Sequence, residues 1–261
     1  MPPPLVVWIT GASSGIGRAM ALEWTRRGAD VAVSARREGK LREVADEIEA
    51  LGQNALVVPC DVTNEAALEA AVQQIVEHFD RLDVAIANAG FGAIGKIEEL
   101  DAETWRRQLD VNVVGLTQTV RHAIPELRKT GGRIGLVGSV ASMTTLPNTG
   151  AYSASKAAVR TIGQALSMEL EGSEVTCTTI HPGLVESEIA RVDNENRHDP
   201  SRAEKRNQDL MWPTDRAARV MVDAIERRKR EYVFTGHGKI MAFLCRHAPG
   251  VMHHVLARFS R

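Results

Sequence analysis

Short runs of apolar residues alternate along the chain with segments whose apolar residues recur every three or four positions. The first run, residues 5–10, is typical of a central strand in a parallel sheet covered on both faces. Residues 38–51 have the period of an amphipathic helix, with Leu41, Val44 and Ile48 on one face. This alternation predicts a single doubly wound α/β domain with a mainly parallel sheet. Its expected strands are residues 5–10, 29–35, 55–59, 82–87, 134–137, 174–180 and 231–235.

A glycine-rich turn joins the first strand to the first helix, which is expected to reach Arg27. Glycines there let the backbone approach a pyrophosphate, and the helix N-terminus adds free N–H groups and positive potential. Alone, such a turn is more often only a tight turn, but its place between a strand and a helix indicates a dinucleotide site. The residues expected to contribute are Gly11, Ser13, Ser14, Gly15, Ile16 and Gly17.

Tyr152 and Lys156 lie four positions apart on the helix expected from residue 150, and so share one face. For the pair alone, two solvated surface residues are the commoner explanation. A tyrosine with a pKa of about 10 needs a downward shift of roughly 3 units, or about 4 kcal/mol, to act as a base near neutral pH. One lysine charge at ~4 Å supplies about that much if the effective dielectric is ~20. The pair therefore requires a partly dry site, and a second positive charge would help.

Ser139 follows the strand expected at residues 134–137 and lies thirteen positions before Tyr152. Ser139, Tyr152 and Lys156, together with the glycine-rich turn, resemble the short-chain dehydrogenase/reductase family over about residues 5–236. The resemblance implies a Rossmann-type oxidoreductase that interconverts a carbonyl and a secondary alcohol. Ser139 would bind the substrate oxygen and Tyr152 would exchange its proton. Lys156 would hold the nicotinamide ribose and, with the charge of the oxidised ring, lower the pKa of the tyrosine.

The end of the second strand is where such folds bind the adenosine ribose. An acidic residue there accepts from a 2′-hydroxyl, whereas a basic residue pairs with a 2′-phosphate. Ala35 stands at the family's acidic position, and Arg36 and Arg37 follow it. We therefore predict NADP(H) over NAD(H), with Arg36 as the main phosphate contact; two arginines on a solvated loop are the alternative.

Further cofactor positions are implied by the resemblance alone. Asp61 would contact the adenine amino group, because Thr63 or Asn64 fits the cap of the next helix better. The family's usual Asn-Asn-Ala-Gly is Ala-Asn-Ala-Gly at residues 87–90, which keeps the small residues beside the cofactor. The hydroxyl of Ser187 would hold the nicotinamide carboxamide. The positions so assigned are Asp61, Val62, Asn88, Ala89, Gly90, Tyr152, Lys156, Pro182, Gly183, Val185 and Ser187.

Asn112 and His181 each have a structural and a functional explanation. An asparagine inside a helix more often points to solvent, but Asn112 matches a family residue that kinks the helix and holds a water beside the catalytic lysine. We prefer that role, through which the proton is replenished. For His181 we expect a core or backbone-positioning role, since Tyr152 already fills that of acid and base.

Residues 1–237 are predicted to form the catalytic domain, with a polar lid at residues 187–212. Residues 238–261 form an amphipathic extension of two basic helical stretches broken at Pro249-Gly250. Packing on the domain or on a partner subunit is the preferred explanation, and weak contact with a membrane surface is the alternative. An apolar pocket would suit acyl, aromatic, terpenoid and steroid carbonyls alike. Its expected residues are Ser139, Met143, Leu146, Leu184, Met211 and Trp212.

Composition narrows the partners of this 261-residue chain. Lys and Arg total 32 against 33 Asp and Glu, so nothing suggests a nucleic-acid partner. Three cysteines read as reduced thiols of a cytoplasmic protein, and no metal site is expected. The first apolar run is too short for a signal peptide, and no run is long enough for a membrane helix.

Two rival functions stay open beside the oxidoreductase. One is an NADPH-binding regulator or redox sensor without turnover, and the other is a reductase of lipid or sterol ketones at a membrane surface. By analogy with the family, a homodimer or homotetramer is expected.

Overall fold

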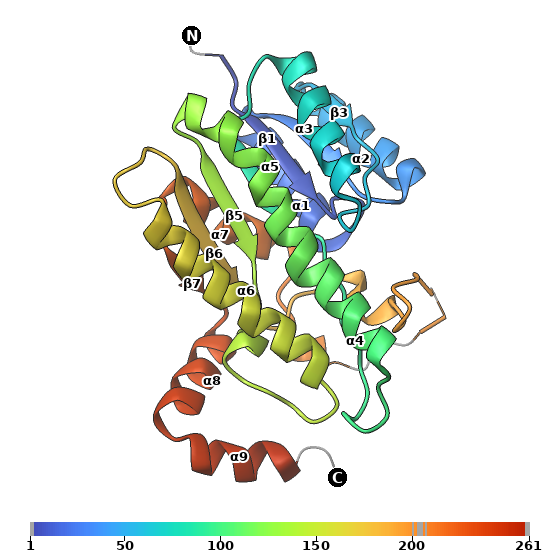
Figure 1. Cartoon of the computed structure of the whole chain (residues 1–261), viewed down its shortest axis with the longest axis vertical. Helices are drawn as coiled ribbons and strands as arrows, with labels where there is room; N and C mark the ends of the chain where they lie inside the picture. Colours follow the sequence, from blue (N-terminus) through green and yellow to red (C-terminus); the bar gives the residue numbers. More distant parts are fainter. Residues whose placement is uncertain (1–2, 200, 203–205, 207, 259–261) are drawn as a thin grey trace.

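The computed structural model describes residues 3–199, 201–202, 206 and 208–258. Within them seven strands form one sheet in the order β3-β2-β1-β4-β5-β6-β7 (Figure 1). Each neighbouring pair is parallel, so the predicted mainly parallel sheet is confirmed and is parallel throughout. The strands are β1 Val6–Thr10, β2 Asp30–Ser34, β3 Ala55–Val57, β4 Val84–Ala87, β5 Arg133–Val137, β6 Thr176–His181 and β7 Glu231–Val233.

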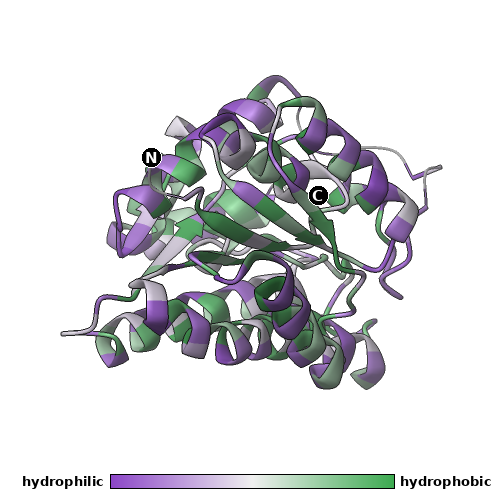
Figure 2. Ribbon diagram, turned by 90° about the horizontal axis from the view of Figure 1, so that it is seen from above, coloured by the Kyte–Doolittle hydropathy of each residue, from purple (hydrophilic) through white to green (hydrophobic). Residues whose placement is uncertain are grey.

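Helices cover both faces of the sheet, and the apolar strands lie between the two layers (Figure 2). One hydrophobic cluster joins the sheet to α1, α2 and α7, and the other joins it to α3, α5 and α6. Burial on both faces explains why the strands read as continuous apolar runs. The helices are α1 Gly15–Arg26, α2 Glu38–Ala50, α3 Glu65–Phe79, α4 Ala102–Leu109, α5 Gly115–Thr130, α6 Gly150–Glu169, α7 Thr214–Glu226, α8 Gly236–His247 and α9 Pro249–Arg258.

The strand order reverses at β1 and β4, which pair although β2 and β3 come between them in the sequence. At such a point the loops leaving the carboxyl ends of the two strands turn to opposite sides and open a crevice for a ligand. The glycine-rich turn leaves β1 there, and residues 88–90 leave β4. The topology therefore selects the place at which the candidate site must lie.

Most expected elements are present with bounds shifted by a few residues, because caps and strand pairing set their ends. β3 ends at Val57, two residues before the expected end. The side chain of Asn64 accepts from the N–H of Ala67, so Asn64 is the cap of α3. Pro213 was expected in the first turn of α7. It is instead the N-cap residue of that helix.

The C-terminal extension forms α8 and α9, which project from the body of the molecule (Figure 1). The break lies at Ala248, and Pro249 begins α9, where a proline is favourable. The start of α8 packs on the domain, since a Cβ on Gly238 would lie 2.9 Å from Val140. The outer apolar faces of α8 and α9 do not pack on the domain within the described part of the chain, and packing on a partner subunit stays a prediction. Their exposed side chains are Ile240, Phe243, Leu244, Val251 and Val255, of which Phe243 is 62% exposed.

Candidate active site

Ser139, Tyr152 and Lys156 meet beyond the carboxyl end of β5. Ser139 is buried two residues after the end of the strand, and its side chain is close enough to Tyr152, on the first turn of α6, to influence the pKa of the phenol. Lys156 lies one turn further along α6, and its Nζ donates to the carbonyl oxygen of Val137 at 2.8 Å. This Nζ is 5.9 Å from the centroid of the Tyr152 ring. The three side chains that the sequence singled out therefore face one point.

Burial and nearby groups shift the pKa of Tyr152 in opposite directions. Burial raises its pKa, while the hydrogen bond with Ser139 and the positive charge of Arg206 act in the opposite direction. Burial also lowers the pKa of Lys156 from 10.5 to about 8. The charges of the chain alone therefore do not lower the phenol pKa, because desolvation outweighs them. At neutral pH Tyr152 is therefore a neutral phenol. The lowering expected from Lys156 together with the charge of an oxidised nicotinamide stays a prediction.

Asn112 is fully buried in a π-helical turn, Asp110–Val114, between α4 and α5. Its Oδ1 accepts from the N–H of Phe91 at 3.0 Å, and its Nδ2 donates to the Phe91 carbonyl at 2.9 Å and to Ser155 Oγ at 3.0 Å. The side chain thus ties the loop after β4 to α6. Its placement inside, and not toward solvent, agrees with the preferred explanation, whereas the proton-replenishing role stays a prediction.

The glycine-rich turn leaves no room for side chains at two of its glycines. Gly11 has φ +68°, and a Cβ there would lie 2.8 Å from Ala89 Cα. A Cβ on Gly17 would lie 2.3 Å from the Gly11 carbonyl oxygen. Asn88 Nδ2 holds the turn from the other side by donating to the carbonyl of Thr10 at 2.9 Å. This close-packed backbone cradle at a helix N-terminus fits the pyrophosphate of a dinucleotide.

A cavity of about 540 Å³ is lined by the glycine-rich turn and by Ser139, Tyr152 and Lys156. Its size is that of a small-molecule site. Every residue predicted to bind the cofactor lines it, from Gly11 to Ser187. The lid adds lining residues that the sequence did not single out, because it indicated only a polar, solvated segment there. These are Glu188, Ile189, Val192, Asn196, Arg197, His198 and Arg206.

The predicted substrate pocket is largely not reproduced. Of its six residues only Ser139 lines the cavity. Trp212 packs against Phe234, with ring centroids 5.7 Å apart, and the guanidinium of Arg216 lies 3.9 Å from its ring. The N–H of Trp212 also donates to the carbonyl of Leu184. Trp212 and Leu184 therefore join the base of the lid to the sheet, and the apolar character of Trp212 reflects this packing.

His181 lies at the end of β6 and is fully buried. Its Nδ1 is 3.2 Å from both the Ser139 carbonyl oxygen and Ser142 Oγ, and its Nε2 is 3.0 Å from Glu231 Oε1. Burial lowers its pKa, although Glu231 acts in the opposite direction. These contacts support the loop that carries Ser139, in agreement with the expected positioning role.

The chain belongs to the short-chain dehydrogenase family, whose family model matches residues 5–198. A curated relative, 11-beta-hydroxysteroid dehydrogenase A of Arachis hypogaea, is 41% identical over 188 residues, which are 71% of this chain and 54% of the relative. The chain thus spans about half the length of that relative.

Solved structures agree with this assignment. A short-chain dehydrogenase/reductase from Burkholderia phymatum in complex with NAD superposes with a TM-score of 0.86 at 26% identity, covering 95% of each chain. An alcohol dehydrogenase from the archaeon Thermococcus sibiricus, complexed with 5-hydroxy-NADP, gives 0.77 at 26% identity, covering 88% of this chain and 95% of its own. Similar structures therefore bind nicotinamide dinucleotides both with and without a 2′-phosphate.

Proposed function

We propose that this protein is an NADP(H)-dependent oxidoreductase that interconverts a carbonyl and a secondary alcohol, with Tyr152 as acid and base. The observation that carries the proposal is the convergence of Ser139, Tyr152 and Lys156 on a cavity that the glycine-rich turn also lines. A substrate oxygen at that point would lie beside two hydroxyl groups and a buried ammonium. Such a site is suited to proton transfer to or from an oxygen.

In the proposed mechanism the hydroxyls of Ser139 and Tyr152 orient the carbonyl oxygen, and Tyr152 donates its proton to that oxygen during reduction. Lys156, whose Nζ lies 5.9 Å from the centroid of the Tyr152 ring, then provides a positive charge beside the phenolate in a buried setting where charge interactions are strong. Asn112 would anchor the water through which Tyr152 regains its proton. A bound nicotinamide supplies or accepts the hydride.

The NADP(H) preference is supported by two arginines in the cleft. Arg36 and Arg37 both line the cavity after β2, where the fold binds the adenosine ribose. Arg36 stays the proposed main contact of the 2′-phosphate. Arg37 lies against the glycine-rich turn, because its Nη2 donates to the hydroxyls of Ser13 and Ser14 at 3.1 and 2.9 Å.

The purified protein is expected to consume NADPH in the presence of apolar ketones. The assay measures the loss of NADPH absorbance with each member of a panel of acyl, aromatic, terpenoid and steroid carbonyls. NADPH should bind about tenfold more tightly than NADH, the effect of one or two hydrogen bonds to a charged group. Equal affinities would contradict the cofactor preference. Tight NADPH binding without turnover of any carbonyl would support the rival function of a regulator or redox sensor.

A second candidate function, reduction of lipid or sterol ketones at a membrane surface, is favoured by the exposed apolar faces of α8 and α9. Residues 236–261 carry four Lys or Arg, four His and no Asp or Glu, which leaves 28 basic and 33 acidic residues for the rest of the chain. Exposed apolar side chains among basic ones are typical of helices that lie on anionic membranes. No helix in the described part of the chain is long and apolar enough to cross a bilayer.

Flotation with vesicles tests this second function. The full chain is expected to float with vesicles that contain phosphatidylglycerol, and less with vesicles of phosphatidylcholine alone. Phe243→Glu combined with Val251→Glu should abolish flotation, because both side chains are exposed and apolar. Met168→Glu is the matched control, since Met168 is 71% exposed on α6 and lies outside the extension. Wild-type protein that stays unbound would remove the membrane proposal.

Three further expectations stay predictions. They are the division into a domain of residues 1–237 with a lid at 187–212 and an extension of residues 238–261, the homodimer or homotetramer, and the cytoplasmic location.

A further inference from the structure

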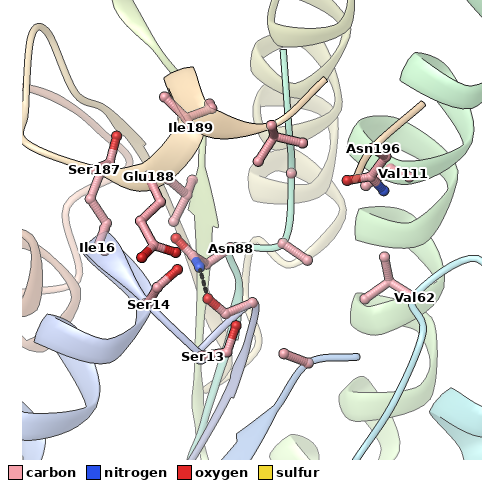
Figure 3. Close-up of a pocket in the computed structure, with 18 of the residues that line it drawn as sticks. Ser13, Ser14, Ile16, Val62, Asn88, Val111, Ser187, Glu188, Ile189 and Asn196 are labelled. Atoms are coloured by element: carbon pink, nitrogen blue, oxygen red, sulfur yellow. Dashed lines mark hydrogen bonds between the residues drawn. The ribbon is translucent and has the colours of Figure 1, made fainter. Parts of the chain in front are cut away.

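The lid residue Glu188 directs its carboxylate into the cleft beside the glycine-rich turn (Figure 3). It opens the short 3-10 helix Glu188–Arg191. Its Oε2 accepts from Arg37 Nη2 at 3.1 Å and lies 3.5 Å from His198 Nε2. Burial raises the pKa of Glu188, but hydrogen bonds from Ser14 and Arg37 and the nearby cations lower it overall. Glu188 is thus held as an anion at this position.

The carboxylate of Glu188 lies among groups of the glycine-rich turn that would also bind a phosphate. Ser14 is the N-cap residue of α1, and the potential at a helix N-terminus favours an anion. Because Arg37 Nη2 also contacts the hydroxyls of Ser13 and Ser14, one guanidinium, two hydroxyls and one carboxylate form a closed cluster. The carboxylate of Glu188 therefore occupies a place in the cleft where a bound anion would be favourable.

The same lid also contacts the second arginine, Arg36, but through uncharged groups. Arg36 Nη2 donates to the carbonyl oxygen of Asn196 at 2.7 Å and to its Oδ1 at 3.1 Å. An antiparallel bridge between Val192 and His198 closes the loop that carries Asn196. Both arginines expected to meet a 2′-phosphate thus contact the lid, and of these two contacts only that of Arg37 is with a carboxylate.

We infer that Glu188 is a specificity-determining residue, whose carboxylate competes with the 2′-phosphate of the cofactor for Arg37 and thereby weakens NADPH binding relative to NADH. The inference rests on the proposed function, because it needs a dinucleotide in the cleft. When a phosphate reaches Arg37, Glu188 must give up the guanidinium or remain beside a second anion. Either event opposes binding, and NADH, which has no 2′-phosphate, avoids most of it.

Titration of the full chain with NADPH and with NADH, followed by protein fluorescence, tests the inference. Glu188→Gln keeps the shape of the side chain and removes its charge. We expect the Kd for NADPH to fall about threefold to fivefold, the effect of one partly exposed charge interaction, and the Kd for NADH to change by less than about twofold. Glu186→Gln, a glutamate two positions away that does not line the cavity, is the matched control and should change neither.

A double-mutant cycle shows whether the effect passes through Arg37. In an Arg37→Ala background, Glu188→Gln should bring no gain in NADPH affinity, because the competed group is absent. An equal gain for both cofactors, no gain, or a gain that persists without Arg37 would overturn the inference. Wild-type protein that binds neither cofactor would instead overturn the proposed function, and the inference with it.

Discussion

Tyr152→Phe is expected to lower kcat/KM for carbonyl reduction by about 10²–10⁴-fold, the contribution of a positioned general acid. The phenol lies beside Ser139, and its raised pKa keeps it protonated at neutral pH. Phenylalanine retains the ring and its packing on α6, so NADPH affinity and the unfolding transition should change little. The measurements are steady-state kinetics with the best ketone of the panel and a fluorescence titration with NADPH.

The other tyrosine of the chain provides the control for this substitution. Tyr232 lies on β7, where its ring packs beside Phe234 and under Lys229, outside the cavity. Tyr232→Phe should leave turnover unchanged. In the wild type, reduction should decline and alcohol oxidation should rise as pH approaches the phenol pKa, since reduction needs the neutral form and oxidation the ionised one. A Tyr152→Phe protein with wild-type turnover would reject Tyr152 as the acid.

Lys156→Met is expected to remove most turnover and yet to raise the free energy of unfolding at neutral pH. The drop in the pKa of Lys156 from 10.5 to about 8 means that folding buries a charge at unfavourable cost. A shift of this size corresponds to about 3 kcal/mol. Loss of the hydrogen bond to the Val137 carbonyl offsets about 1 kcal/mol or more. Methionine fills a similar volume without a charge, so a net gain of about 1–2 kcal/mol follows.

The pH dependence separates this effect from a simple change of packing. Between pH 8 and 10.5 the unfolded chain keeps the lysine proton while the folded chain releases it, so this group raises wild-type stability as pH rises. The advantage of Lys156→Met should therefore be largest below pH 8 and shrink above it, as measured by urea unfolding over this range. Lys129→Met, at a lysine 67% exposed on α5, should show no such trend. A Lys156→Met variant less stable than the wild type at neutral pH would contradict the argument.

Local patterns were sufficient to predict much of the molecule. Apolar runs and helical periods predicted the seven strands and most helices, because each element's pattern records which of its faces is buried. The turn from Gly11 to Gly17 could be identified because its glycines are close together in the sequence and allow a tight local backbone conformation between a strand and a helix. Tyr152 and Lys156 could be paired because their spacing along one helix sets their relation.

Contacts between distant segments could not be read in this way. The carboxylate of Glu188 contacts Arg37, which lies 151 positions away in the sequence. Trp212 does not line the predicted pocket, because it packs against Phe234 and Arg216. The direction of the pKa shift of Tyr152 likewise depends on how much solvent the assembled fold removes. Hydrophobic period and helical spacing are properties of a segment, so the order of residues determined the architecture and the catalytic triplet. Desolvation and partners across the cleft are properties of the packed whole, so only the folded arrangement determined the pKa shifts of the site and the lining that the lid contributes.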